Sequence, residues 1–71
     1  MSKWFIDHRQ QFIADTLRVF GQINRQILVD KFNISEPQAS VDLRTFQQQH
    51  PDVMIYDGRV KCYILNKDAL E

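Results

Sequence analysis

The sequence predicts a small α+β domain that is mainly helical, with three helices followed by a β-hairpin. Two observations support this fold class. Apolar residues recur at helical spacing up to about residue 49. Two short runs of β-prone residues then flank Asp57-Gly58, a dipeptide that strongly favours a hairpin turn. With 71 residues, the chain is expected to form one domain around a thin core.

The first helix is expected over residues 3–20. Its apolar stripe comprises Ile6, Ile13, Leu17 and Phe20, and is widened by Phe5, Phe12 and Val19. Gly21 then ends the helix, because glycine adopts the left-handed conformation of a helix C-terminus without strain. Gln22-Ile23 is expected to be a short connector, with room for one pair of strand residues.

The second helix is expected over residues 25–32, with Asn24 as its N-cap. Ile23 before the cap and Leu28 inside the helix can form a hydrophobic staple. The residues expected to point inward are Ile27, Leu28 and Phe32. Asn33 follows the helix, and asparagine tolerates the left-handed conformation that a sharp turn between helices needs.

The third helix is expected to run from Glu36 to about Gln49. Ser35 can cap it, and Gln38, three residues later, completes a capping box in which each side chain satisfies a free backbone N–H. Pro37 falls in the first turn, where its missing N–H costs nothing. The buried stripe of this helix is expected to be Ala39, Leu43 and Phe46.

The opposite face of the third helix carries short or hydrogen-bonding side chains and a single charge: Gln38, Ser40, Val41, Arg44, Thr45 and Gln48. Side chains of this kind can contact the edges of DNA bases. The alternative is a solvated face of a three-helix bundle. Arg44 is expected to contact a base or a phosphate, and a surface ion pair with Asp30 or near Asp42 is its alternative role.

The two strands are expected at residues 53–56 and 59–65, joined by a two-residue type I′ turn at Asp57-Gly58. In that register Ile55 lies opposite Val60. The expected core face comprises Val53, Ile55, Val60 and Cys62, and the more exposed face comprises Met54, Tyr56, Arg59, Lys61 and Tyr63. A hairpin alone is marginal in water, so this one must pack on the helices.

Arg59 and Lys61 lie beside the expected hairpin tip. They can grip phosphate or probe the minor groove, or they can be edge-strand charges that oppose aggregation, and both roles can hold together. Three helices followed by a hairpin is the element order of a winged helix-turn-helix. This domain is expected to cover residues 1–65, and residues 66–71 form a polar tail that is expected to fray.

The charge and composition of the chain bear on whether it binds DNA, forms a disulfide or enters a membrane. Nine basic and nine acidic residues give no net charge, which argues against strong DNA binding unless the charges are segregated. The single cysteine, Cys62, excludes an internal disulfide and is expected to be a small core residue. The sequence has no signal-peptide pattern and no membrane-length apolar run, so a cytoplasmic protein without membrane contact is expected.

The sequence contains no arrangement of residues that predicts catalysis. It has no believable nucleophile-base pair, no glycine-rich phosphate loop and no carboxylate pair placed for acid-base work. His8, His50 and Cys62 do not have metal-ligand spacing. The prediction is therefore that the protein is not an enzyme and that it needs no cofactor or metal.

Several segments together resemble one family, the N-terminal winged-helix domain of bacterial WYL-domain transcriptional regulators, which includes regulators of anti-phage defence islands. The similarity covers roughly residues 10–65, and its motif, ISEPQAS-x-DLR, is fairly specific. The segments that carry it are Ile23-Asn24-Arg25-Gln26, residues 32–40, Asp42-Leu43-Arg44, Tyr56-Asp57 and Lys61-Cys62-Tyr63.

The resemblance implies a dimeric, sequence-specific DNA-binding repressor whose third helix enters the major groove. On that basis Gln38, Ser40 and Arg44 contact double-stranded DNA, and Arg59 and Lys61 serve the wing. Val41 departs from the family, which commonly has arginine at this position; it can contact a thymine methyl, or DNA affinity has been lost. Family members also carry a downstream ligand-sensing region, so the chain is expected to be a stand-alone domain or an excised fragment.

Two questions stay open at this level. Trp4 and Phe5 either complete the core or, with the first helix, form a homodimer interface. The second question is whether the domain binds DNA or is a winged-helix protein-interaction module without strong DNA binding. Clustering of the basic residues on one face would favour DNA, and even scatter would favour docking; the residues concerned are Arg9, Arg25, Arg44, Arg59 and Lys61.

Overall fold

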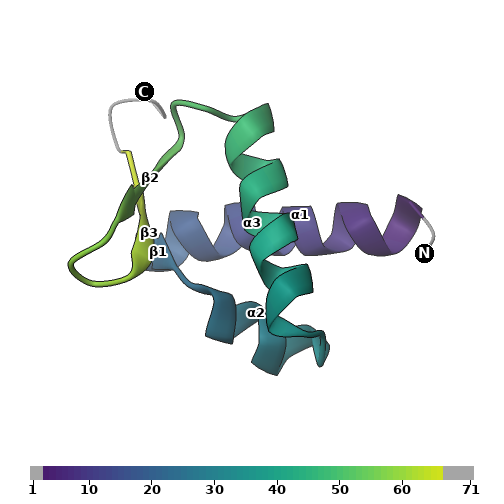
Figure 1. Ribbon diagram of the computed structural model, residues 1–71. Helices are drawn as coiled ribbons and strands as arrows, with labels where there is room; N and C mark the ends of the chain where they lie inside the picture. Colours follow the sequence, from purple (N-terminus) through teal and green to yellow (C-terminus); the bar gives the residue numbers. More distant parts are fainter. Residues whose placement is uncertain (1–2, 67–71) are drawn as a thin grey trace.

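The computed structural model describes residues 3–66, which form three helices and a small antiparallel sheet (Figure 1). In chain order the elements are α1 (Lys3–Phe20), β1 (Gln22–Ile23), α2 (Arg25–Phe32), α3 (Glu36–Gln49), β2 (Met54–Asp57) and β3 (Cys62–Leu65). The three predicted helices and the fold class are confirmed. Residues 67–71 of the expected polar tail lie outside the described part of the chain.

The residues predicted to end or begin helices do so. Gly21 has φ 78°, and its N–H donates to the Leu17 carbonyl at 2.8 Å, which closes α1. Asn24 caps α2, because its side-chain oxygen accepts from the Ile27 N–H at 3.0 Å. Asn33 is left-handed with φ 54° and turns the chain toward α3.

Only one half of the predicted capping box at α3 is formed. The Ser35 hydroxyl accepts from the Gln38 backbone N–H at 3.2 Å. The expected return bond, from the Ser35 N–H to the Gln38 side chain, is not among the hydrogen bonds of residues 3–66. The Gln38 amide instead donates to the Asp42 carboxylate at 3.0 Å, because a charged acceptor one turn along the helix is the stronger partner.

The sheet has the strand order β1-β3-β2, with both pairs antiparallel. The connector at Gln22–Ile23 is therefore a true strand, which adds to the edge of the hairpin. A backbone bond from Leu65 to the Gly21 carbonyl, 2.9 Å long, joins the end of β3 to the end of α1. These bonds hold the hairpin against the helices.

The hairpin loop is longer than predicted. Asp57 pairs with Cys62, so residues 58–61 form the loop in place of a two-residue type I′ turn. The Asp57 carboxylate stabilises this loop, because it accepts from the Arg59 backbone N–H at 2.9 Å. Lys61, with φ 56°, returns the chain to β3 in a left-handed conformation.

The face of the hairpin that enters the core is the opposite of the predicted one, although the same residues share a face in the predicted and observed registers. Met54 is fully buried, whereas Ile55 and Val60 are 57% and 56% exposed. The predicted core face is therefore wrong, and its other members, Val53 and Cys62, are only half-buried. Side chains alternate along a strand, so burying Met54 necessarily turns Ile55 outward.

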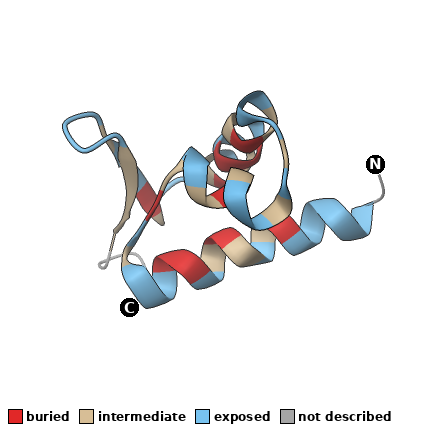
Figure 2. Ribbon diagram, turned by 90° about the horizontal axis from the view of Figure 1, so that it is seen from below, coloured by how far each residue is buried: buried red, intermediate tan, exposed pale blue. Residues whose placement is uncertain are grey.

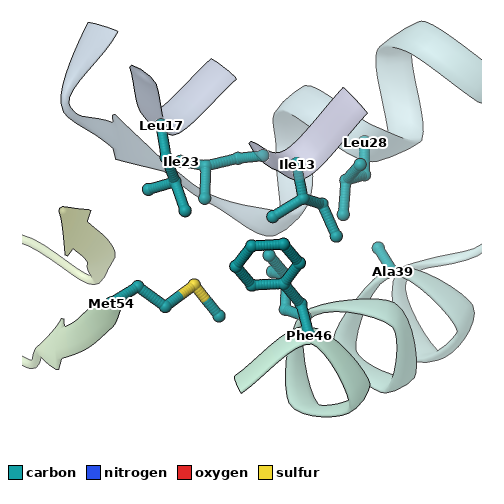
Figure 3. Close-up of a cluster of buried hydrophobic side chains, with 8 residues drawn as sticks. Ile13, Leu17, Ile23, Leu28, Ala39, Phe46 and Met54 are labelled. Carbon is teal, nitrogen blue, oxygen red and sulfur yellow. The ribbon is translucent and has the colours of Figure 1, made fainter. Parts of the chain in front are cut away.

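One apolar cluster joins all the helices to the sheet (Figure 3). The Phe46 ring from α3 lies between Met54 of β2 and the α1 residues Ile13 and Leu17. The cluster comprises Ile13, Leu17, Ile23, Leu28, Ala39, Leu43, Phe46 and Met54. The stripe predicted for α3 is thus buried, and so is the Ile23–Leu28 staple.

Both ends of α1 stay outside this core, which corrects the predicted α1 stripe (Figure 2). The exposed apolar residues of the helix are Trp4, Phe5, Ile6, Val19 and Phe20. Trp4 is 64% exposed, packs against Phe5 and stacks on His8 with ring centroids 5.2 Å apart. Of the two roles considered for Trp4 and Phe5, completing the core is therefore excluded.

A buried ion pair joins α1 to α3. Arg9 Nε donates to Asp42 Oδ2 at 2.7 Å, and a second guanidinium nitrogen donates to Oδ1 at 3.2 Å. Each side chain is only 5% exposed. The Gln10 amide donates to the Asp42 carbonyl at 2.9 Å, so the contact also holds the α3 backbone. Such a pair depends on both partners, because either charge alone would be buried without compensation.

We predict that Asp42→Leu lowers the free energy of unfolding by about 3–5 kcal/mol, because it leaves the Arg9 charge buried and unpaired. The double variant Arg9→Met/Asp42→Leu should recover most of that loss, since it removes both charges. Urea unfolding followed by circular dichroism measures both effects. Equal destabilisation in the single and double variants would show that the pair is not coupled in this way.

Candidate nucleic-acid interface

A cavity of about 290 Å³ separates α3 from the hairpin and from the start of α2. Residues of α2, of α3 and of the hairpin line it, and the hairpin loop itself is exposed (Figure 2). The residues that line the cavity are Asn24, Arg25, Ser40, Leu43, Arg44, Tyr56, Lys61 and Tyr63. All but Leu43 carry polar or charged groups, so the cavity suits a polar ligand rather than an apolar one.

Local structure explains why the three cations of this cavity lie together. Arg25 is the first residue of α2, directly after the Asn24 cap. Arg44 lies on α3 one turn after Ser40. Lys61 reaches the cavity because its left-handed conformation ends the hairpin loop at this point.

Two tyrosines form the hairpin side of the cavity. Tyr56 and Tyr63 are paired across β2 and β3, and their rings make an edge-to-face contact with centroids 5.0 Å apart. The pairing follows from the observed register and would not occur in the register predicted from a two-residue turn. The hairpin therefore contributes two hydroxyl groups as well as Lys61.

The electrostatics of the cavity are one-sided. Its lining contains three cations and no carboxylate. A neighbouring cavity of about 160 Å³ shares Arg25 and Lys61 and adds Glu36. Within residues 3–66 no ion pair involves Arg25, Arg44 or Lys61. Clustered cations repel one another and attract an external anion, and the N-terminal end of α2 adds to this potential.

The residues predicted from sequence to contact DNA fall into three places. Ser40, Arg44 and Lys61 line the cavity. Val41 and Gln48 are exposed, and Thr45 is half-buried, on α3. These six residues lie on α3 or where the hairpin loop meets β3.

The other two predicted residues do not line the cavity, and each contacts an aspartate of the chain. Gln38 is half-buried at the start of α3, and its amide is bonded to Asp42. Arg59 lies in the hairpin loop with its side chain 92% exposed and 3.5 Å from the Asp57 carboxylate. Arg9, the fifth cation in the proposed clustering test, is buried in the core and takes no part in the surface.

Five lining residues were not among the predicted site residues: Asn24, Arg25, Leu43, Tyr56 and Tyr63. Arg25 could have been predicted from the sequence, because it directly follows the predicted cap Asn24. At that position its positive charge lies beside the free backbone N–H groups at the start of α2, and both attract an anion. The two tyrosines depend on the hairpin register and had no local signal.

Residues 3–66 contain no group of three or more potential metal ligands, and Cys62 is half-buried with its sulfur 3.4 Å from the Val60 carbonyl. None of the helices described is both long enough and apolar enough to cross a membrane.

Comparison with known proteins agrees with the arrangement of the elements. Residues 6–69 match the family described as the BrxR transcriptional regulator winged helix-turn-helix domain. A protein of Escherichia coli (strain KTE188) named DNA-binding transcriptional repressor CapW is 44% identical over 62 residues. Proteins of the same name from Stenotrophomonas maltophilia and Pseudomonas aeruginosa are 42% and 40% identical over the same length.

The matched segment is 87% of this chain and 21% of each of these relatives, so the chain spans about a fifth of their length. The similarity to WYL-domain regulators that the motif ISEPQAS-x-DLR indicated is confirmed. The chain belongs to the winged helix-turn-helix domain family of BrxR transcriptional regulators.

Proposed function

We propose that this chain is a sequence-specific DNA-binding domain of a transcriptional repressor, with α3 in the major groove. The observation that carries the proposal is the convergence of Arg25, Arg44 and Lys61 on one cavity that contains no carboxylate. The relatives named as DNA-binding transcriptional repressors support it. Repression would follow from occupation of a promoter.

The cavity is suited to the phosphate backbone that separates the two grooves. With α3 in the major groove, the hairpin lies over the neighbouring backbone, and the cavity lies between them. Arg25 and Lys61 would pair with phosphate oxygens there, and the Tyr56 and Tyr63 hydroxyls can donate to the same strand. Contacts of this kind orient the protein on DNA without reading its sequence.

Base reading is assigned to the exposed face of α3. Arg44 can donate to guanine or reach a phosphate from the rim of the cavity. Val41 is exposed and can pack against a thymine methyl group. Ser40, Thr45 and Gln48 supply shorter hydrogen-bonding groups along the same helix.

The zero net charge does not oppose this proposal, because three cations lie together on the cavity and two of the nine acidic residues are engaged elsewhere in the chain. Asp42 is buried with Arg9, and Asp57 is engaged in the hairpin loop. The cations of the cavity have no such partners within residues 3–66. Clustering of basic residues on one face favours DNA binding over a protein-interaction module. Of the five basic residues considered, Arg25, Arg44 and Lys61 cluster on the cavity.

We predict that Arg44→Ala weakens binding to the preferred DNA sequence by about 1–3 kcal/mol, because a base or phosphate contact is lost. The matched control is Arg18→Ala, which removes an exposed arginine of α1 that lies 3.8 Å from Asp15. Fluorescence anisotropy on a duplex selected from a random library measures the change. A library that yields no enriched sequence at low salt would contradict the proposal and favour the protein-interaction module.

The double variant Arg25→Ala/Lys61→Ala tests the phosphate contacts separately. Each phosphate contact contributes roughly 0.9 to the slope of log K against log salt, so the slope should fall by about two. Binding should weaken to a similar extent on preferred and random duplexes, since phosphates carry no sequence information. A change in sequence preference with an unchanged slope would contradict this assignment.

The proposal includes a homodimer formed through the exposed N-terminal part of α1. Trp4 and Phe5 present a contiguous aromatic surface to solvent, and self-association would bury it. A two-fold axis would pair two copies of α3 on a palindromic operator, with half-sites about 10 base pairs apart or a multiple of that.

We predict that Trp4→Ala/Phe5→Ala shifts the chain toward monomer in sedimentation velocity, because it removes the proposed contact surface. Phe20→Ala is the matched control, as it removes an exposed aromatic ring from the opposite end of α1. An identical shift in both variants, or no concentration dependence in the unmodified chain, would argue against this interface.

A further inference from the structure

We infer that the buried Arg9–Asp42 pair sets which DNA base Gln38 can read, and that it selects adenine over guanine. The inference rests on the proposed function, since it requires α3 to lie in the major groove. It goes further, because it assigns a base to one residue and gives a specificity role to two residues that cannot touch DNA.

Asp42 is held in one orientation before Gln38 is considered. Its two carboxylate oxygens accept from two nitrogens of Arg9, at 2.7 and 3.2 Å. Both side chains are 5% exposed, and the Asp42 carbonyl is bonded to Gln10. A carboxylate fixed by two parallel bonds cannot rotate to accommodate a neighbour.

This fixed carboxylate determines which way the Gln38 amide points. An ionised carboxylate only accepts hydrogen bonds, so the amide nitrogen of Gln38, and not its oxygen, must face Asp42. The bond from Gln38 Nε2 to Asp42 Oδ1 is 3.0 Å long. The opposite orientation would place two acceptor oxygens against each other.

The Gln38 amide oxygen is left for an external donor. It makes none of the hydrogen bonds of residues 3–66, and it is not one of their buried side-chain atoms without a partner. The amide nitrogen also keeps a second N–H, because only one is donated to Asp42. Gln38 therefore presents one acceptor and one donor in a fixed order.

This order matches adenine and opposes guanine. Adenine presents an amino donor at N6 beside the N7 acceptor, whereas guanine presents two acceptors, O6 and N7. Gln38 lies in the first turn of α3, the part of a recognition helix that approaches base edges. If the Gln38 amide could rotate by 180° and exchange its oxygen and nitrogen, it would discriminate less between adenine and guanine. The preference for adenine therefore depends on the bond between Gln38 and Asp42.

The experiment starts from a duplex selected by the 71-residue chain from a random library. Each adenine of the selected site is replaced in turn by guanine, or by purine nucleoside, which lacks the N6 amino group. At one position the unmodified chain should lose about tenfold in affinity with purine nucleoside, since one hydrogen bond is lost, and more with guanine.

Gln38→Ala should make the chain insensitive to purine nucleoside at that position, with a change below about twofold, while the Arg9–Asp42 pair stays intact. The matched control is Gln49→Ala, which removes an exposed glutamine from the last turn of the same helix and should leave the adenine preference at that position unchanged. A selected site at which no position responds to Gln38→Ala would overturn the inference and leave the proposed function standing. Failure to select any sequence would overturn both.

The role of the Arg9–Asp42 pair in orienting Gln38 is tested separately, through the ratio of adenine to guanine affinity. Arg9→Met/Asp42→Leu removes the acceptor that orients Gln38, so the ratio of adenine to guanine affinity should fall toward one. A purely structural role would lower both affinities together and leave the ratio unchanged, which would overturn the inference.

A second measurement needs no variant of the pair. One side-chain N–H proton of Gln38, assigned by its loss in Gln38→Ala, should be shifted downfield by donation to the carboxylate. A pair of amide shifts typical of a solvent-exposed glutamine would overturn the inference.

Discussion

The Arg9–Asp42 ion pair is the constraint on which the rest of this structure depends. A chain of this size has a thin apolar core, and apolar contacts alone permit small rotations of one helix on another. A bidentate pair is directional, so it fixes how α3 crosses α1. The same carboxylate binds Gln38, which couples the α1–α3 contact to the first turn of the proposed recognition helix.

The pair also bears on how a neutral chain can carry a cationic site. Two acidic groups are engaged within the chain, Asp42 in the core with Arg9 and Asp57, whose side chain is 30% exposed, with the hairpin loop. The cations around the cavity come from α2, α3 and the hairpin and are left without an acidic partner within residues 3–66. The electrostatic potential around the cavity, and not the net charge of the chain, therefore determines how strongly this surface attracts DNA.

The hairpin loop links the fold to this site. A loop of four residues, closed by the Asp57 side chain and left-handed at Lys61, directs Lys61 to the cavity and pairs Tyr56 with Tyr63. Met54, on the same face of the hairpin as Tyr56 and Tyr63, enters the core beside Phe46 (Figure 3). The loop and its register therefore decide which hairpin side chains line the proposed phosphate site.

The sequence by itself determined the three helices, their caps at Asn24 and Ser35, and the family, because helix periodicity and capping depend on residues three or four positions apart. It also pointed to Ser40, Arg44 and Lys61, which the fold brings together. Only the tertiary structure decided that Asp42 is buried, that Met54 and not Ile55 enters the core, and that Arg25 joins the cavity. Each of these depends on packing between segments that are distant in the sequence, which residues three or four positions apart do not determine.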